Sequence, residues 1–301
     1  MLIPNQFMYN QIDSNKRRTW ALIIIFVAVV LGLGWFVGYY FDYGYGALAA
    51  AAVISLVMAL FSYYGGDKLA LWSAKAQPVG KTDNPYVYNL VENLCITAGV
   101  PAPKVYIILD EAINAFATGR DPQHASIAVT IGAINKLANE ELEGVIAHEL
   151  SHIKNYDIRL MTVVIVLVGL ISLLADFFFR GSLLGVGRKN DRDSGGNWLM
   201  IVGVILIILS PIIAQLIQLA VSRRREYLAD ASGALLTRYP EGLARALEKI
   251  AADPAVLANA SAATAHLYIA NPFKGSGKFL ARAFSTHPPV EERIKKLREM
   301  A

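Results

Sequence analysis

The chain of 301 residues has few charged residues and almost no cysteine. Only 17% of its residues are charged, against about a quarter in an ordinary soluble domain, and 55% are hydrophobic. This composition excludes a disordered chain and favours a membrane protein. The single cysteine, Cys95, cannot form an internal disulfide, which is typical of a reducing compartment. We expect it in the core of an amphipathic helix.

The sequence also lacks the marks of two other classes of protein. Its net charge is +4, but lysine and arginine fall mostly at the borders of apolar runs, where they set membrane topology, so we expect a lipid bilayer as a partner and no nucleic acid. No small-residue cleavage pattern follows the first apolar run, and a second run comes soon after it, so a cleaved signal peptide is not expected.

Four apolar stretches approach the length of about 20 residues that a membrane-spanning helix requires. They cover about residues 19–40, 46–64, 160–179 and 198–221. The turn between the first two contains no lysine or arginine, whereas basic residues precede the first and follow the second. The positive-inside rule therefore places both flanks of this hairpin in the cytoplasm.

The second pair of apolar runs conflicts with the same rule. Residues 180–197 between them include Arg188, Lys189 and Arg192, which oppose an outside location, and Asp176 weakens the third run. A hairpin that enters the bilayer without fully crossing it is the alternative.

The remaining sequence has the composition of a water-facing globular protein. Apolar residues at helical spacing predict a helix over 84–98. Another helix is predicted to begin at an N-cap at Asn139, because acidic residues follow in its first turn, where the helix dipole favours negative charge. Further helices are predicted over 223–236, 242–251 and 291–300. Branched and aromatic residues predict strands over 104–109, 112–118 and 126–131. We expect the strands to form a small antiparallel sheet.

His148 and His152 belong to a His-Glu-x-x-His pattern on the helix after Asn139. Leu142, Ile146, Leu150 and Ile153 form its apolar stripe, which leaves the histidines unexplained by packing. Two imidazoles one turn apart can bind one zinc ion, and Glu149 between them can act as general base toward a zinc-bound water. Two surface histidines are the alternative.

A zinc site of this kind needs a third protein ligand. Asn155 and Ile158 stand where a metzincin would have its glycine and third histidine, so a glutamate on a second helix is the other option. Glu226 meets this need, and Asp230, one turn later, would accept a hydrogen bond from a ligand histidine. The alternative for Glu226 is an ion pair with its arginine neighbours. If His148, His152 and Glu226 share an ion, the segment between them crosses the bilayer an even number of times.

These motifs resemble those of membrane zinc metalloproteases of the HtpX type in peptidase family M48, and more distantly the Ste24-type CAAX prenyl proteases. The resemblance rests on Asn114-Ala115-Phe116-Ala117, the zinc motif and residues 222–230. It implies an α+β, mostly helical fold, with a gluzincin-like zinc metalloprotease domain in a multi-span membrane protein.

The resemblance also divides the chain into five segments. A cytoplasmic N-terminus (1–18) precedes a transmembrane hairpin (19–64) and the first part of the protease domain (65–158). A second hairpin (159–221) and the second part of the domain (222–301) follow.

The resemblance implies further site residues. Asn114, Ala115 and Phe116 are expected on an edge strand that receives the substrate backbone, since an extended peptide can add to a sheet edge through main-chain hydrogen bonds. A turn residue is the alternative for Asn114. His287 and Arg293 are expected to stabilise the oxyanion, because attack on the scissile peptide bond puts negative charge on its carbonyl oxygen and hydrogen-bond donors are needed there. A plain histidine at a helix entry is the alternative for His287.

We therefore expect an integral-membrane zinc endopeptidase with one Zn²⁺ per subunit, located in the cell membrane with its active site facing the cytoplasm. The resemblance implies protein or peptide substrates among damaged or misassembled membrane proteins. An intramembrane protease would place the zinc motif within an apolar run, but charged residues flank this one. A non-catalytic membrane scaffold is the alternative from a different class.

Overall fold

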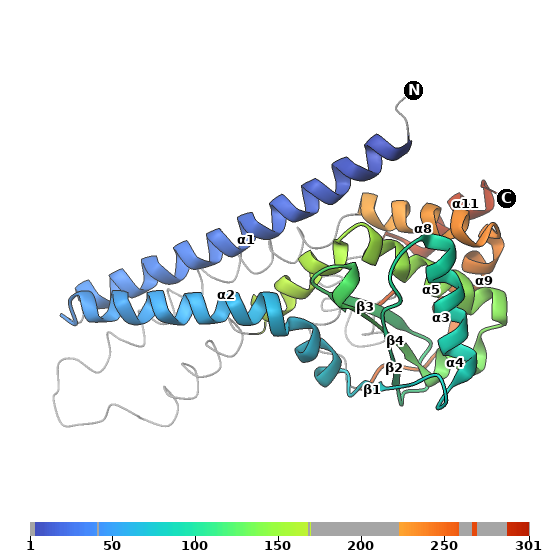
Figure 1. Ribbon diagram of the computed structural model, residues 1–301, viewed down its shortest axis with the longest axis horizontal. Helices are drawn as coiled ribbons and strands as arrows, with labels where there is room; N and C mark the ends of the chain where they lie inside the picture. Colours follow the sequence, from blue (N-terminus) through green and yellow to red (C-terminus); the bar gives the residue numbers. More distant parts are fainter. Residues whose placement is uncertain are drawn as a thin grey trace.

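The computed structural model describes residues 4–40, 42–167, 169, 223–258, 267–269 and 288–300. In it, two long helices project from a globular part: α1 (Pro4–Tyr40) and α2 (Tyr45–Ser73), which lie side by side over much of their length (Figure 1). Two helical segments, Gln11–Phe36 and Tyr45–Ser73, are long and apolar enough to cross a membrane. Helix α1 begins before the first predicted span and α2 ends after the second, so residues 16–18 lie inside α1 and α2 continues to Ser73.

The contact between α1 and α2 depends on glycine. A Cβ on Gly34 would lie 2.3 Å from the Cβ of Ala51, and one on Gly38 would lie 2.5 Å from the carbonyl oxygen of Gly44. This small-residue spacing of four is typical of membrane helices that approach closely. Large apolar side chains remain exposed along both helices, among them Ile24, Ile25, Val53, Ile54 and Val57, as expected of a surface that faces lipid.

The sheet has four strands in the order β1-β2-β4-β3. They are β1 (Gln77–Pro78), β2 (Lys104–Ile108), β3 (Ala115–Gly119) and β4 (Ala125–Thr130). The sheet is mixed, because β2 and β4 are parallel while β1–β2 and β3–β4 are antiparallel. The prediction of an antiparallel sheet was therefore wrong: the chain reverses once before β3 and again before β4, and β4 then inserts beside β2 in the same direction.

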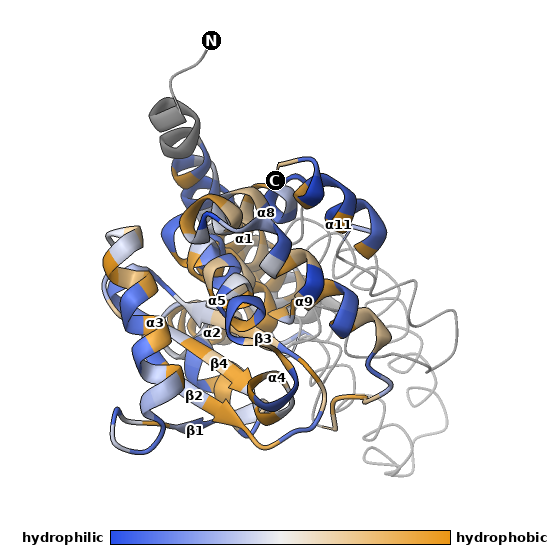
Figure 2. Ribbon diagram, turned by 90° about the vertical axis from the view of Figure 1, so that its right-hand side faces the viewer, coloured by the Kyte–Doolittle hydropathy of each residue, from blue (hydrophilic) through white to orange (hydrophobic). Residues whose placement is uncertain are grey.

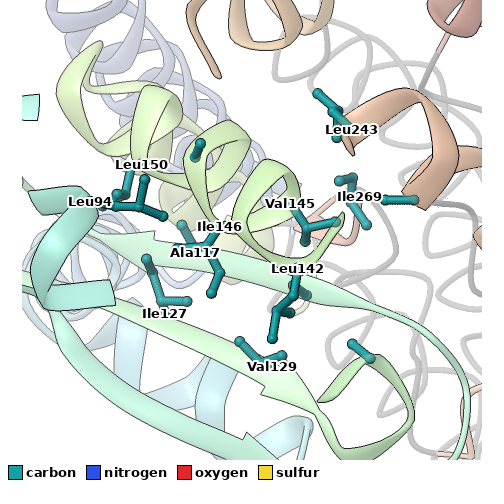
Figure 3. Close-up of a cluster of buried hydrophobic side chains, with 14 of the residues drawn as sticks. Leu94, Ala117, Ile127, Val129, Leu142, Val145, Ile146, Leu150, Leu243 and Ile269 are labelled. Carbon is teal, nitrogen blue, oxygen red and sulfur yellow. The ribbon is translucent and has the colours of Figure 1, made fainter. Parts of the chain in front are cut away.

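The core of the globular part lies between this sheet and α5 (Asn139–Lys154). Figure 3 shows side chains of α5 above those of β3 and β4, with Leu94 of α3 (Pro85–Ala98) at one end and Leu243 of α9 (Pro240–Ala252) at the other. The predicted apolar stripe of α5 is fully buried. Each such side chain contributes about 1.5–3 kcal/mol when it is removed from water. Figure 2 shows β2 and β4 mostly in the hydrophobic colour and α11 (Val290–Arg298) mostly in the hydrophilic colour.

Most of the predicted helix ends are confirmed. The side chain of Asn84 accepts a hydrogen bond from the backbone N–H of Val87, and Gly99 ends α3 in the left-handed conformation at φ 66°. The N-cap of α5 was predicted one residue late. It is Ala138, whose N–H donates to Glu141 at 2.7 Å, and Asn139 is the first helical residue.

α8 (Arg223–Thr237) packs against α5, and α4 (Ile131–Lys136) follows β4. Residues 157–167 are helical and almost entirely buried. The rest of the third apolar run, the fourth run and the basic loop 180–197 lie outside the described residues.

Candidate metal centre

His148 and His152 point into the same buried space from one face of α5. Their Nε2 atoms are 3.2 Å apart, and the side chains are 1% and 4% exposed. The face that carries them is therefore as buried as the apolar stripe, because α8 covers it. Two imidazole nitrogens this close, both inside the protein, are arranged to share a ligand.

Glu226 of α8 completes the group. Its Oε2 lies 3.8 Å from Nε2 of His148, and its Oε1 lies 3.7 Å from Nε2 of His152. Ligands of a tetrahedral zinc ion, with bonds of about 2.0–2.2 Å, lie roughly 3.3–3.6 Å from one another. The three side chains therefore fit a single ion of this kind, and they were the three ligands that the sequence predicted.

The close packing of α8 on α5 brings this carboxylate to the histidines. Glu226, Asp230 and Gly233 follow one another at helical spacing on the face that meets α5. A Cβ on Gly233 would lie 3.0 Å from the backbone nitrogen of His148, tighter than nearly all real contacts. Glycine at this position thus sets how near Glu226 can approach.

Each histidine has a carboxylate beside its Nδ1 atom. Oδ1 of Asp230 lies 2.9 Å from Nδ1 of His148, a contact of hydrogen-bond length but poor angle. Asp230 in turn receives two hydrogen bonds from Arg293, from Nε at 2.8 Å and from Nη2 at 2.7 Å. This ion pair keeps the pKa of Asp230 well below its usual range, although burial acts to raise it. Asp230 is therefore a negative partner of His148.

The partner of His152 was missed by the sequence reasoning. Oδ2 of Asp157 lies 3.0 Å from Nδ1 of His152, and Asp157 is 2% exposed. A carboxylate here holds the Nδ1–H tautomer and leaves Nε2 free to bind metal. The sequence does show an acidic residue five positions after the second histidine. Its charge and polarity alone do not distinguish a buried partner of His152 from a side chain exposed to solvent.

Glu149 lies on α5 between the two histidines and is 2% exposed. Burial raises its pKa to about 8, while the charge of His152 and a hydrogen bond from the backbone of Ala117 act in the opposite direction. A buried carboxylate that binds a proton near neutral pH is suited to general base work.

Comparison with known proteins identifies the family. The model of Peptidase family M48 matches residues 81–301. The chain is 45% identical over 296 residues to a protein named Protease HtpX homolog from Caldanaerobacter subterraneus subsp. tengcongensis, covering 97% of this chain and 98% of that one. A homologue of the same name from Dictyoglomus turgidum is 46% identical over 292 residues, with 97% and 94% covered. The chain belongs to peptidase family M48.

It is thus a membrane metalloprotease of the HtpX type, and the family implies a bound metal. A solved structure of Ste24p from S. mikatae matches with a TM-score of 0.49 and 18% identity, covering 96% of this chain and 67% of that one. The likeness to HtpX homologues extends over α1 and α2 as well as the globular part, because the alignments cover nearly the whole chain.

The M48 chain has β3 at the edge of its sheet, as the sequence predicted for the segment after Asn114. The outer side of this edge is partly occupied: the N–H of Ile269 donates to the carbonyl oxygen of Ala115 at 3.2 Å, and Tyr268 packs edge-on against Phe116 with ring centroids 5.3 Å apart. Asn114 precedes the strand, and its side chain accepts from the N–H of Ala115. Substrate binding by these three residues stays a prediction.

Of the predicted oxyanion pair, the structure describes only Arg293. His287 lies outside the described residues. Arg293 is 2% exposed, and its guanidinium donates to Asp230 and, from Nη1, to the carbonyl oxygen of Ile269 at 3.2 Å. In this structure Arg293 therefore acts on Asp230, and its expected contact with an oxyanion stays a prediction.

Proposed function

We propose that the protein is a zinc-dependent endopeptidase, embedded in the cell membrane by several spans, that cleaves membrane or misfolded proteins at the cytoplasmic face. The observation that carries this proposal is the convergence of His148, His152 and Glu226, whose ligand atoms all lie within 4.8 Å of one another. In this role Zn²⁺, one per subunit, would act as a Lewis acid toward the substrate carbonyl and lower the pKa of a water molecule.

Glu149 would move the protons of the reaction. Its carboxylate accepts a proton from the water that attacks the scissile carbonyl, and then delivers this proton to the amide nitrogen as the C–N bond breaks. The burial that raises its pKa also removes competing solvent from the site. The backbone N–H of Ala117 holds the carboxylate beside β3, where a substrate strand would lie.

The activity is tested by replacing the proposed base. Glu149→Gln in the full-length, detergent-purified protein should abolish cleavage of casein while zinc content stays near one ion per chain. Glu140→Gln, an exposed acid in the first turn of the same helix, is the matched control and should cleave like the wild type. Unchanged cleavage by Glu149→Gln would refute the assigned base. Zinc binding with no cleavage in the wild type would favour the non-catalytic scaffold.

A preference for unfolded chains follows from the proposed mode of binding. A peptide that adds to the edge of β3 must be extended, and a folded domain does not offer such a segment. We expect casein or a denatured protein to be cleaved much faster than the same protein in its native state. Equal rates on native and denatured forms would contradict binding at the sheet edge.

The cytoplasmic orientation is supported by the basic residues at the base of the α1–α2 hairpin, including Lys16, Arg17 and Lys68. The packing of α8 against α5 supports the proposal that the segment between them ends on the side of the bilayer where it begins. Accessible cysteines test this: an impermeant maleimide added to intact cells should label Tyr43→Cys at the hairpin turn and should not label Lys295→Cys on α11. The reverse pattern would contradict the proposed orientation.

A further inference from the structure

Asn15 of α1 is a polar residue buried inside the protein at 1% exposure. It lies in the N-terminal part of α1, near the start of the segment that is long and apolar enough to cross a membrane, and packs against the end of α5 and the start of α8. Burying an amide costs free energy unless it is hydrogen-bonded, so its partners show what holds it there.

The amide of Asn15 uses both of its functional groups. Nδ2 donates to Oδ1 of Asp157 at 2.6 Å and to the backbone carbonyl of Asn155 at 2.9 Å. Oδ1 accepts from Nη1 of Arg225 at 3.3 Å. A neutral amide suits this position because it offers donors to a carboxylate on one side and an acceptor to a guanidinium on the other.

Both side-chain partners of Asn15 lie next to proposed zinc ligands, one in space and one in the sequence. Asp157 binds Asn15 through one carboxylate oxygen and His152 through the other. Arg225 immediately precedes Glu226 in α8, and its Nε lies 3.7 Å from Oδ1 of Asp157. One side chain of the membrane hairpin thus holds the carboxylate that orients His152 and the guanidinium that immediately precedes Glu226 in α8.

We propose that Asn15 is a positioning residue of the metal centre, which makes the first membrane helix a structural part of the zinc site. This inference rests on the proposed zinc-dependent function. The residue touches neither substrate nor metal; it acts by holding the Asp157 carboxylate against His152 and by holding Arg225 beside it.

The first test measures the zinc affinity of full-length protein in detergent by chelator competition. Asn15→Leu keeps the number and branching of the side-chain heavy atoms and removes all three hydrogen bonds, so zinc should bind about tenfold more weakly, at the lower end of what loss of an outer hydrogen bond costs a metal site. The visible spectrum of the Co²⁺-substituted variant should shift, and kcat should fall while KM is unchanged. Ser62→Ala, which removes a buried hydroxyl of α2 that donates to the carbonyl of Val163, should leave all three readouts unchanged.

The second test exchanges the two partners. Asn15→Asp places two carboxylates against each other and should weaken zinc binding at least as much as Asn15→Leu. In Asn15→Asp/Asp157→Asn, the new amide can donate to residue 15 and still accept from Nδ1 of His152. Zinc affinity and the Co²⁺ spectrum should therefore recover in part. A structural role without effect on the site would not produce this rescue.

Three results would overturn the inference. One is zinc affinity within about twofold of wild type in both single variants, far below the loss expected for an outer-shell group. Another is a double variant that binds zinc no more tightly than Asn15→Asp. The third is failure of every Asn15 variant to fold, since positioning requires a folded protein with a weakened site. A wild-type protein that binds no zinc would instead overturn the proposed function.

Discussion

His148 and His152 are proposed ligands one turn apart on α5, yet they are supported by opposite ends of the chain. His148 is backed by Asp230 and then by Arg293, both from the C-terminal part. His152 is backed by Asp157 and then by Asn15 of the N-terminal membrane helix. Asp230 is joined to a buried guanidinium by two hydrogen bonds, whereas Asp157 is bonded to a neutral amide and lies 3.7 Å from the guanidinium of Arg225.

This difference is visible in the pKa values of the two histidines. Burial lowers the pKa of His148, and the charges of His152 and Arg293 act in the same direction, so Asp230 does not reverse the effect. Burial acts in the same direction on His152, but Asp157 and Glu226 outweigh it and raise the pKa to about 9. Because the ion pair between Arg293 and Asp230 is tighter than the contact between Arg225 and Asp157, we expect the His148 support to matter more for the stability of the fold than the His152 support.

The largest effect is therefore expected from Asp230→Ala. It leaves the guanidinium of Arg293 buried without its carboxylate, and breaking a buried pair in this way costs about 3–5 kcal/mol. The unfolding temperature in detergent should fall strongly and zinc should be lost. Asp230→Ala/Arg293→Met removes the stranded charge and should regain much of the unfolding temperature but not the zinc affinity. A double variant as unstable as the single one would contradict this account.

A smaller loss of stability is expected from Asp157→Ala. Arg225 is also buried, but its Nε lies 3.7 Å from Oδ1 of Asp157, a looser contact than the two hydrogen bonds of 2.8 and 2.7 Å between Arg293 and Asp230, and its bond to Asn15 remains. Zinc affinity should nevertheless fall about 10- to 100-fold, because His152 loses the partner that fixes its tautomer. The measurement is chelator competition beside thermal unfolding. An unfolding temperature as low as that of Asp230→Ala would remove the proposed distinction between the two supports.

Gly233→Ala tests the spacing between α8 and α5 on the His148 side. The added Cβ meets the backbone of His148 at 3.0 Å, and overpacking of this kind costs about 1–3 kcal/mol. We expect a modest fall in both unfolding temperature and zinc affinity. Gly32→Ala in α1, where the new Cβ meets nothing within 4 Å, is the matched control and should not be destabilised. Equal behaviour of the two variants would show that the close approach is not required.

The last prediction concerns the chemical reactivity of Cys95, which belongs to neither support. Burial, with a contribution from Glu92, raises the pKa of this thiol to about 11. At pH 8 only about one thiol in a thousand is then the reactive thiolate. The folded wild type should not react with a thiol reagent until it is unfolded, which also makes it a clean background for the cysteine labelling above. Rapid labelling of the native protein would contradict the buried position.

The group formed by His148, His152 and Glu226 could be predicted in part because helix geometry determines which side chains share a face. Histidines four apart on a helix face the same way, and Glu226 and Asp230 share a helix face for the same reason. The caps of α3 likewise follow from Asn84 and Gly99. The sheet was predicted to be antiparallel, whereas β2 and β4 are parallel, because strand order depends on where the chain returns and not on the composition of each strand.

The support of His152 could not be predicted in this way. Asp157 returns to His152 because the chain turns at Tyr156, which adopts a positive φ of 59°, a conformation that its residue type does not indicate. Asn15 is 142 residues from Asp157, and nothing in a helix of mostly apolar residues marks one asparagine as a partner of a distant carboxylate. Such contacts become visible only when the packing of α1 against α5 and α8 is known.

Zinc-edge X-ray absorption on the full-length protein, wild type beside Glu226→Ala, tests the metal centre most directly. For the wild type we expect a zinc coordination shell of nitrogen and oxygen atoms at about 2.0–2.1 Å that includes two imidazoles and no sulfur. In Glu226→Ala, zinc should be lost, or the shell should lose its carboxylate while both imidazoles remain. A shell with fewer than two imidazoles, or one that Glu226→Ala leaves unchanged, would contradict the site described here.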